Sequence, residues 1–222
     1  MTGRRLTQRQ QSRIQRLQDS RRARADQQID VVDHAGLSSE QTGLLITHHG
    51  RALVVEDSAG RLHRCAARQN LGRLACGDRV IWQLTGAGAG VIVALGERRS
   101  LLTRPDYHGQ PRPVAANLDA VAVVLAPEPE PSEYLIDRYL VAIAAIGVQG
   151  LLVLNKLDVL DAPALAVLTQ RLEPYRRIGY PLLLTSSYAA HGLDTLRAWL
   201  RGRVSLLVGQ SGVGKSSLIK AL

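Results

Sequence analysis

The hydrophobic pattern of the second half of the chain alternates between short apolar runs and longer amphipathic stretches. Residues 120–126 are apolar without interruption, which is typical of a strand buried on both faces of a parallel sheet. After this run, apolar side chains recur at helical spacing, as in Leu135, Tyr139, Leu140 and Ile143. The expected strands are 120–126, 150–154, 181–184 and 204–208. The expected helices are one that Ser132 caps and that runs to about Ile146, and those at 162–177, 193–200 and 216–222. This alternation predicts a parallel α/β sheet.

The pattern between residues 40 and 97 is different, with short alternating segments separated by turn residues. The expected strands are 43–48, 51–55, 61–65, 79–84 and 91–95. Five short strands in so few residues favour a small closed barrel of the OB type, although an SH3-like barrel would give much the same pattern. Trp82 is expected in the barrel core, because it lies on the apolar face of its strand with Val80 and Leu84.

Arginines and prolines dominate residues 97–117, which therefore read as a connector. The expected organisation is an arm at 1–34, an OB-fold RNA-binding barrel at 35–98, and the connector with the α/β domain at 99–222.

The composition and the apolar run lengths of the chain predict a cytoplasmic location. Apolar residues make up 45% of the chain, no run approaches the roughly 18 apolar residues of a membrane span, and the N-terminus does not resemble a signal peptide. Cys65 and Cys76 make neither a disulfide framework nor a metal site, and read as buried thiols in a reducing compartment. We expect a soluble cytoplasmic monomer without membrane contact.

Positive charge is concentrated at the N-terminus. The net charge of the chain is +9, and residues 1–26 hold eight arginines against two aspartates, a net charge of +6. An arm of this kind suggests nucleic acid first and an anionic membrane second, and a solvated helix without a specific role is the alternative. The RNA-binding candidates are Arg4, Arg5, Arg9, Arg13, Arg16, Arg21, Arg22 and Arg24 in the arm, with Arg51 and Arg64 in the barrel.

A phosphate-binding loop follows the last expected strand. Residues 209–216 fit the pattern G-x-x-x-x-G-K-[ST] between a strand and a helix, which is the context this motif requires. Its glycines let backbone N–H groups converge on phosphate, Lys215 is expected to reach the β- and γ-phosphates, and the Ser216 hydroxyl is expected to bind Mg²⁺. The candidate phosphate-binding residues are Gly209, Gln210, Ser211, Gly212, Val213, Gly214, Lys215, Ser216 and Ser217.

A second motif, Asn155-Lys156-Leu157-Asp158, directly follows the strand at 150–154 and matches the N-K-x-D box of guanine-nucleotide-binding proteins. Guanine presents two adjacent N–H donors, and the two oxygens of the Asp158 carboxylate can accept both. Asn155 is expected to brace the loop and contact the purine edge, and the Lys156 stem is expected to cover the ring face. Without this context, the same four residues would be an ordinary helix start with Asp158 as its cap.

A third loop, Thr185-Ser186-Ser187, follows the strand at 181–184, at the edge where parallel sheets bind ligands. GTPases place a backbone N–H here against guanine O6, so Ser186 and Ser187 join the guanine-site candidates. Alone, this loop would be an ordinary turn. The order of the three motifs is permuted, because the base-recognition loops come before the phosphate loop.

This permuted order, behind a small barrel and an arginine-rich arm, resembles the ribosome small subunit-dependent GTPase A family. Further segments are similar to that family: Thr103-Arg104-Pro105, the run 113–119, and the arm with Gln8, Gln10 and Gln11. The resemblance implies a circularly permuted α/β P-loop GTPase domain, GTP/GDP and Mg²⁺ as ligands, and GTP hydrolysis in late maturation of the small ribosomal subunit. The small ribosomal subunit and its rRNA are the implied partners.

The sequence departs from the family after Ser216, because it holds no later switch threonine, D-x-x-G box or zinc-binding module. We therefore expect an incomplete G domain, in which the strand 204–208 lacks neighbours and the catalytic apparatus is not whole. No catalytic residue is identified, and zinc is expected only outside this sequence. An RNA-binding adaptor with only structural nucleotide binding, or a P-loop ATPase, are the alternative functions.

Overall fold

The computed structural model describes residues 38–49, 52–85, 89–189 and 191–222. These residues form two compact units, one reaching to Gly72 and including Arg79–Gly96, the other made of Arg73–Asp78 and Glu97–Leu222. The arginine-rich arm and Arg51 lie outside the described residues.

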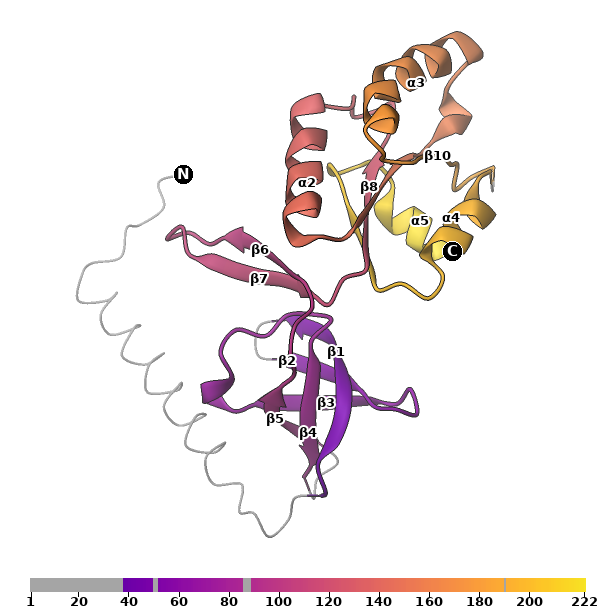
Figure 1. Ribbon diagram of the computed structural model, residues 1–222. Helices are drawn as coiled ribbons and strands as arrows, with labels where there is room; N and C mark the ends of the chain where they lie inside the picture. Colours follow the sequence, from indigo (N-terminus) through magenta and orange to yellow (C-terminus); the bar gives the residue numbers. More distant parts are fainter. Residues whose placement is uncertain (1–37, 50–51, 86–88, 190) are drawn as a thin grey trace, which may run out of the picture. The chain divides into compact units, whose positions relative to one another are not determined.

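The first unit is a closed five-stranded barrel. Its strands are β1 (Gln41–His49), β2 (Ala52–Glu56), β3 (Leu62–Ala67), β4 (Arg79–Leu84) and β5 (Gly90–Leu95), and a short 3₁₀ helix, η2 (Gln69–Leu71), follows β3. The barrel closes in the order β1-β2-β3-β5-β4, with β1 paired to both β2 and β4 and with β3 parallel to β5 (Figure 1). This strand order confirms the OB-type barrel and argues against the SH3-like alternative.

Apolar side chains fill the barrel. Leu45, Val55, Trp82 and Ile92 are fully buried, so Trp82 is a core residue, as expected. Burial raises the pKa of the Cys65 thiol to about 11, which keeps this free cysteine protonated and unreactive. Cys76, which belongs to the second unit, is also free but only half-buried.

The turn between β2 and β3 is organised by a single buried carboxylate. Asp57 accepts a hydrogen bond from Nε2 of His63 at 3.0 Å, and others from the backbone N–H and Nε of Arg61 and the backbone N–H of Ala59, each at 2.9 Å. The His63 ring also lies 4.5 Å from the Trp82 ring. The hydrogen bonds from His63 and Arg61 hold the pKa of Asp57 well below its ordinary value.

The lowered pKa predicts an acid-dependent contribution of Asp57 to barrel stability. Because the folded-state pKa is depressed, the contribution is complete above the ordinary carboxyl pKa near 4 and declines as the pH falls below it. We expect Asp57→Asn to lower the free energy of unfolding at pH 7, and its difference from wild type to shrink as the pH falls from 5 to 3. Urea unfolding followed by Trp82 fluorescence in a Trp199→Phe background measures this. A difference that stays constant over that pH range would contradict the assignment.

The second unit contains a four-stranded parallel sheet with the order β10-β9-β8-β11. Its elements are β8 (Ala120–Leu125), α2 (Glu133–Ile146), β9 (Gln149–Leu154), η3 (Leu157–Val159), α3 (Ala162–Arg177), β10 (Leu182–Leu184), α4 (Leu193–Leu200), β11 (Ser205–Val208) and α5 (Lys215–Ala221). β11 pairs with β8, so the expectation that this strand would lack neighbours was wrong. Strand order reverses between β8 and β11, and parallel sheets bind ligands at such a point.

Helices cover both faces of this sheet. Val121, Val123 and Leu125 of β8 pack into one apolar cluster with residues of α2 and α3, including Ile136 and Leu172. The alternate side chains of β8 pack into a second cluster with α4 and α5 (Figure 1). The continuous apolar sequence of β8 is explained by this burial on both faces.

The expected connector is a β-hairpin. β6 (Leu101–Pro105) and β7 (Pro111–Ala116) pair antiparallel, and Asp106 closes the turn by accepting from the backbone N–H groups of His108 and Gln110. Prolines are tolerated because each strand of a two-stranded ribbon has one free edge. The signal in the sequence was the turn Asp106-Tyr107-His108-Gly109, which the prolines obscured.

Residues 73–78, expected inside the barrel range, belong to the second unit. The Cys76 carbonyl accepts from the backbone N–H of Ala116, and Asp78, which is fully buried, pairs with the guanidinium of Arg98 at 2.7 and 2.8 Å. The cap expected for α2 does not form. Ser132 is the residue before α2 but makes no capping hydrogen bond, whereas Asp161 caps α3 through the N–H of Ala164.

In the described part of the chain, no helix is both long and apolar enough to cross a membrane.

Candidate functional site

Three loops meet at the carboxyl ends of the parallel strands. The loop after β9 carries Asn155–Asp158, the loop after β10 carries Thr185–Ser187, and the loop after β11 carries residues 209–214. Because β8 lies between β9 and β11, the phosphate loop and the N-K-x-D loop flank the end of one central strand. The structure therefore brings the three motifs together, although they are distributed over 62 residues of sequence from Asn155 to Ser216.

Two glycines of the phosphate loop pass so close to their neighbours that no other residue fits. A Cβ on Gly209 would lie 2.2 Å from the carbonyl oxygen of Val124, and one on Gly214 would lie 2.4 Å from Nδ2 of Asn155. Both residues also have positive φ angles, 145° and 91°. Because of this close approach, a side chain at either position would displace the loop from the end of β8 or from Asn155.

Lys215 and Ser216 lie at the first turn of α5. Nζ of Lys215 donates to the carbonyl oxygens of Gly209 at 3.0 Å and Gln210 at 2.7 Å. An ammonium group has three N–H donors, so one remains for a phosphate oxygen. Ser216 is exposed, which leaves its hydroxyl accessible as a metal ligand. α5 begins at Lys215, one residue earlier than expected.

Asn155 is the side chain that joins the loops. It is 1% exposed, its Nδ2 donates to the carbonyl oxygen of Val213 in the phosphate loop at 3.0 Å, and its Oδ1 accepts from the Thr185 hydroxyl at 3.3 Å. The NH₂ group and the carbonyl oxygen of the Asn155 side chain therefore contact two different loops. Asn155 was expected to brace its own loop. In the structure its side chain also links that loop to the other two.

Asp158 is held by the third loop. One carboxylate oxygen accepts a short hydrogen bond from the Ser186 hydroxyl, which itself accepts from the backbone N–H of Ala189 at 3.0 Å. The backbone N–H of Ser186 donates to the carbonyl oxygen of His191 at 3.0 Å. The Ser187 hydroxyl is buried and has no hydrogen-bond partner among the described residues.

The segment after β8 is a part of the site that sequence reasoning missed. Nζ of Lys156 donates to the carbonyl oxygen of Glu128 at 2.9 Å, and Lys156 adopts a left-handed backbone with φ of 62°. Pro129 lies 3.7 Å from the position a Cβ would take on Gly212. Thr185 was noted only as part of its loop, yet it is fully buried and bonds to Asn155. The position of residues 127–131 at the end of a parallel strand was the available signal.

Of the RNA-binding candidates, only Arg64 lies in the described residues, where it is exposed on β3. Its neighbour His63 instead serves the barrel, through Asp57 and Trp82. Within the described ranges, no group of three or more His, Cys, Asp or Glu side chains could hold a metal ion. The resemblance led us to expect zinc only outside this sequence, so that expectation stays untested.

Comparison with known proteins shows which family the chain is similar to. A family model described as RsgA GTPase matches residues 95–222. Over 226 residues the chain is 46% identical to a Pseudomonas aeruginosa (strain LESB58) protein named small ribosomal subunit biogenesis GTPase RsgA, and the match covers 100% of this chain and 67% of the relative. A protein of the same name from Azotobacter vinelandii (strain DJ / ATCC BAA-1303) is 47% identical over 230 residues, with the same two coverages.

Two solved structures share the fold. YjeQ from Thermotoga maritima matches with a TM-score of 0.69 and 34% identity, over 82% of this chain and 64% of that one. YloQ, described as a circularly permuted GTPase, matches with a TM-score of 0.62 and 28% identity, over 84% of this chain and 65% of that one. The chain thus spans less than two thirds of either solved protein.

Proposed function

Because the chain belongs to the RsgA GTPase family, we propose that it binds GTP and GDP, takes part in GTP hydrolysis and acts in late maturation of the small ribosomal subunit. The observation that carries the proposal is the joining of three loops at one sheet edge through Asn155 and Asp158. We further propose that the protein is a cytoplasmic monomer and that its arm and barrel bind rRNA. Membrane contact is not part of this proposal.

The residues present fit a guanine nucleotide with Mg²⁺. The close-packed glycines leave a cradle of backbone N–H groups, Lys215 keeps one free donor over it, and the exposed Ser216 hydroxyl would hold the metal ion. The ion would supply positive charge at the β- and γ-phosphates. At the other end of the site, the Asp158 carboxylate would accept the two N–H groups of guanine while Ser186 fixes its orientation.

The test of this function is nucleotide choice followed by turnover. GDP and ADP compete for the chain against a fluorescent guanine nucleotide, and GDP is expected to bind at least a hundredfold more tightly, because adenine would leave Asp158 desolvated and unpaired. GTP hydrolysis by the complete protein is then measured with and without purified small ribosomal subunits. Equal binding of GDP and ADP would favour a P-loop ATPase, and GTP binding without hydrolysis on subunits would favour an RNA-binding adaptor.

The arm predicts a salt dependence of subunit binding. Eight arginines in residues 1–26 should bind rRNA mainly through phosphates, and each contact contributes about 0.7–0.9 to the slope of log affinity against log salt. Deleting residues 1–26 is expected to weaken binding to small subunits and to flatten the slope by several units, with GTP affinity almost unchanged.

The matched control for the arm replaces its eight arginines by lysine, which keeps the charge and should keep most of the slope. Binding to anionic vesicles is measured in parallel and is expected to be weak, since Ile14 and Leu17 are too few for an apolar face. Equal slopes for deleted and complete chains would contradict an rRNA-binding arm.

A further inference from the structure

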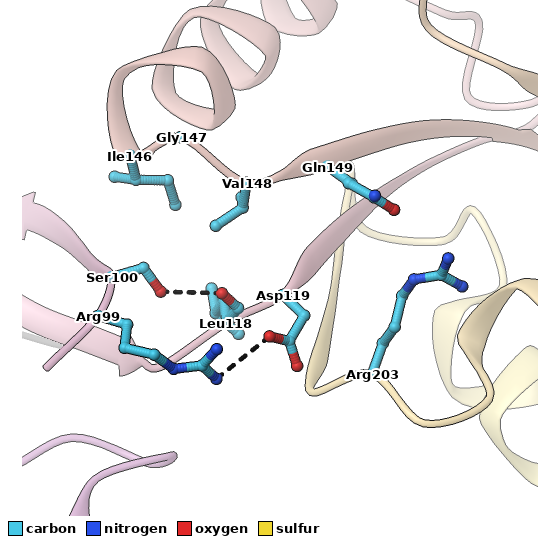
Figure 2. Close-up of a pocket in the computed structure, with 9 residues that line it drawn as sticks. All are labelled: Arg99, Ser100, Leu118, Asp119, Ile146, Gly147, Val148, Gln149 and Arg203. Carbon is cyan, nitrogen blue, oxygen red and sulfur yellow. Dashed lines mark hydrogen bonds and ion pairs between the residues drawn. The ribbon is translucent and has the colours of Figure 1, made fainter.

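A second cavity lies at the edge of the sheet opposite the nucleotide site. Its volume is about 320 Å³, and residues at the amino-terminal ends of the strands line it, among them Asp119 before β8, Gln149 at the start of β9 and Arg203 before β11 (Figure 2). β8 has six residues, which separates this edge from the phosphate loop by roughly 20 Å at the usual rise per residue of a strand. No motif predicted this cavity.

Two arginines contribute charge to the cavity, and both keep free donors. Nη2 of Arg99 donates to Asp119 at 3.2 Å, and the other oxygen of Asp119 accepts from the backbone N–H of Val204 at 2.9 Å. Arg203 donates from Nη1 to the Trp199 carbonyl oxygen, and its guanidinium lies 5.3 Å from the centre of the Trp199 ring. A guanidinium has five N–H donors, so each arginine keeps several that no described residue accepts.

The rest of the lining combines an apolar floor with one amide. Leu118 is buried and Ile146 and Val148 are half-buried, all three belonging to the edge of the main apolar cluster. The Gln149 side chain, which is exposed, lines the same cavity as Arg203 (Figure 2). An apolar surface for a flat ring, flanked by amide, carboxylate and two guanidinium groups, matches the chemistry of a single nucleotide.

Two residues that line the cavity, Arg99 and Asp119, flank a hairpin that carries further arginines. β6 begins two residues after Arg99, β7 ends three residues before Asp119, and their hairpin carries Arg104 and Arg112 as exposed, directly paired neighbours. Tyr107 at the hairpin turn is 98% exposed. Exposed arginines with an exposed aromatic ring fit a nucleic-acid strand better than an acidic peptide, which offers nothing to the apolar floor.

We propose that this cavity binds one unpaired nucleotide of RNA, with its phosphate on the N–H donors of Arg99 and Arg203 that Asp119 and Trp199 do not accept, and with its base on the floor formed by Leu118, Ile146 and Val148. The inference rests on the proposed RNA-binding function and adds a nucleotide-recognition site to it. The site is separate from the GTP site, so its loss leaves GTP affinity unchanged.

The test uses the complete chain and a ten-nucleotide single-stranded RNA that contains 4-thiouridine. The double variant Arg99→Gln/Arg203→Gln is expected to bind the RNA about tenfold more weakly and to lower the salt slope by about 0.7, the value for one phosphate contact. Gln149→Glu, which leaves both arginines in place, is expected to weaken binding as well, because it adds negative charge beside the phosphate. Arg201→Gln is the matched control, since Arg201 is exposed and does not line the cavity.

Photo-crosslinking of the thiouridine to the peptide containing residues 146–149 in wild type, and its loss in the double variant, would support the proposal. Binding by both test variants equal to that of Arg201→Gln would overturn it while leaving RNA binding by the chain intact. Failure of wild type to bind the RNA would overturn the RNA-binding function as well. If a glutamate-rich peptide displaced the RNA and no crosslink formed, the proposal would be overturned, and an acidic peptide would be the ligand of the cavity.

Discussion

Asp158→Asn is expected to reduce the affinity of the protein for GTP by about 3–5 kcal/mol, which is roughly a hundredfold to several thousandfold. The carboxylate accepts one hydrogen bond from Ser186 and still has lone pairs on both oxygens for the two N–H groups of guanine. An amide in its place offers one acceptor oxygen, and its NH₂ group would face the exocyclic amine of guanine. One charge-assisted pair of hydrogen bonds is therefore lost and a donor–donor conflict is introduced.

The same variant is expected to gain affinity for xanthine nucleotides, because the C2 carbonyl of xanthine accepts from the new amide. Titration of wild type and Asp158→Asn with GDP and with xanthosine diphosphate measures both effects. Asp161→Asn is the matched control, since Asp161 lies three residues further on, and its replacement can still cap α3 through the N–H of Ala164. Unchanged GDP affinity in Asp158→Asn would show that base recognition lies elsewhere.

Asn155→Ala is expected to weaken the binding of every nucleotide, whichever base it carries. The variant leaves the buried Val213 carbonyl without its partner, at a cost of about 1–3 kcal/mol, and the Thr185 hydroxyl keeps only the Leu154 carbonyl oxygen, at 3.5 Å. The phosphate loop loses its connection to the base loop, so we expect a loss of about 2–4 kcal/mol in the binding of both GDP and xanthosine diphosphate.

The contrast between these two variants is the informative measurement. Xanthine should restore binding to Asp158→Asn but not to Asn155→Ala, because only the first defect concerns the base. Asn117→Ala is the control for general destabilisation, since Asn117 is also buried and donates to the Gly77 carbonyl far from this site. Its folded fraction should bind GDP normally. Restoration of Asn155→Ala by xanthine would mean that Asn155 contacts only the base.

Most elements of the α/β unit could be predicted, because they depend on residues close in sequence. The boundaries of α3 and α4 agree with expectation to the residue, and the apolar run of β8 identified the central strand. The hairpin of β6 and β7 was missed because its prolines argue against strands, while the free edges that tolerate them exist only once two strands have paired. Local pattern describes a strand but does not show what lies beside it.

The sequence by itself predicted the chemistry of the nucleotide site, namely which residues are expected to carry it and that the expected base is guanine, and it determined that the motif order is permuted. Those conclusions need only short motifs and the elements that flank them. The tertiary structure alone decided that Asn155 bonds to Val213, that Lys156 reaches Glu128, and that Arg99 and Arg203 share a cavity. Asn155 and Val213 are 58 residues apart, and Arg99 and Arg203 are further apart still. Contacts of this range depend on which strands are neighbours in the sheet, and strand order is set by the packing of the whole unit rather than by any local pattern.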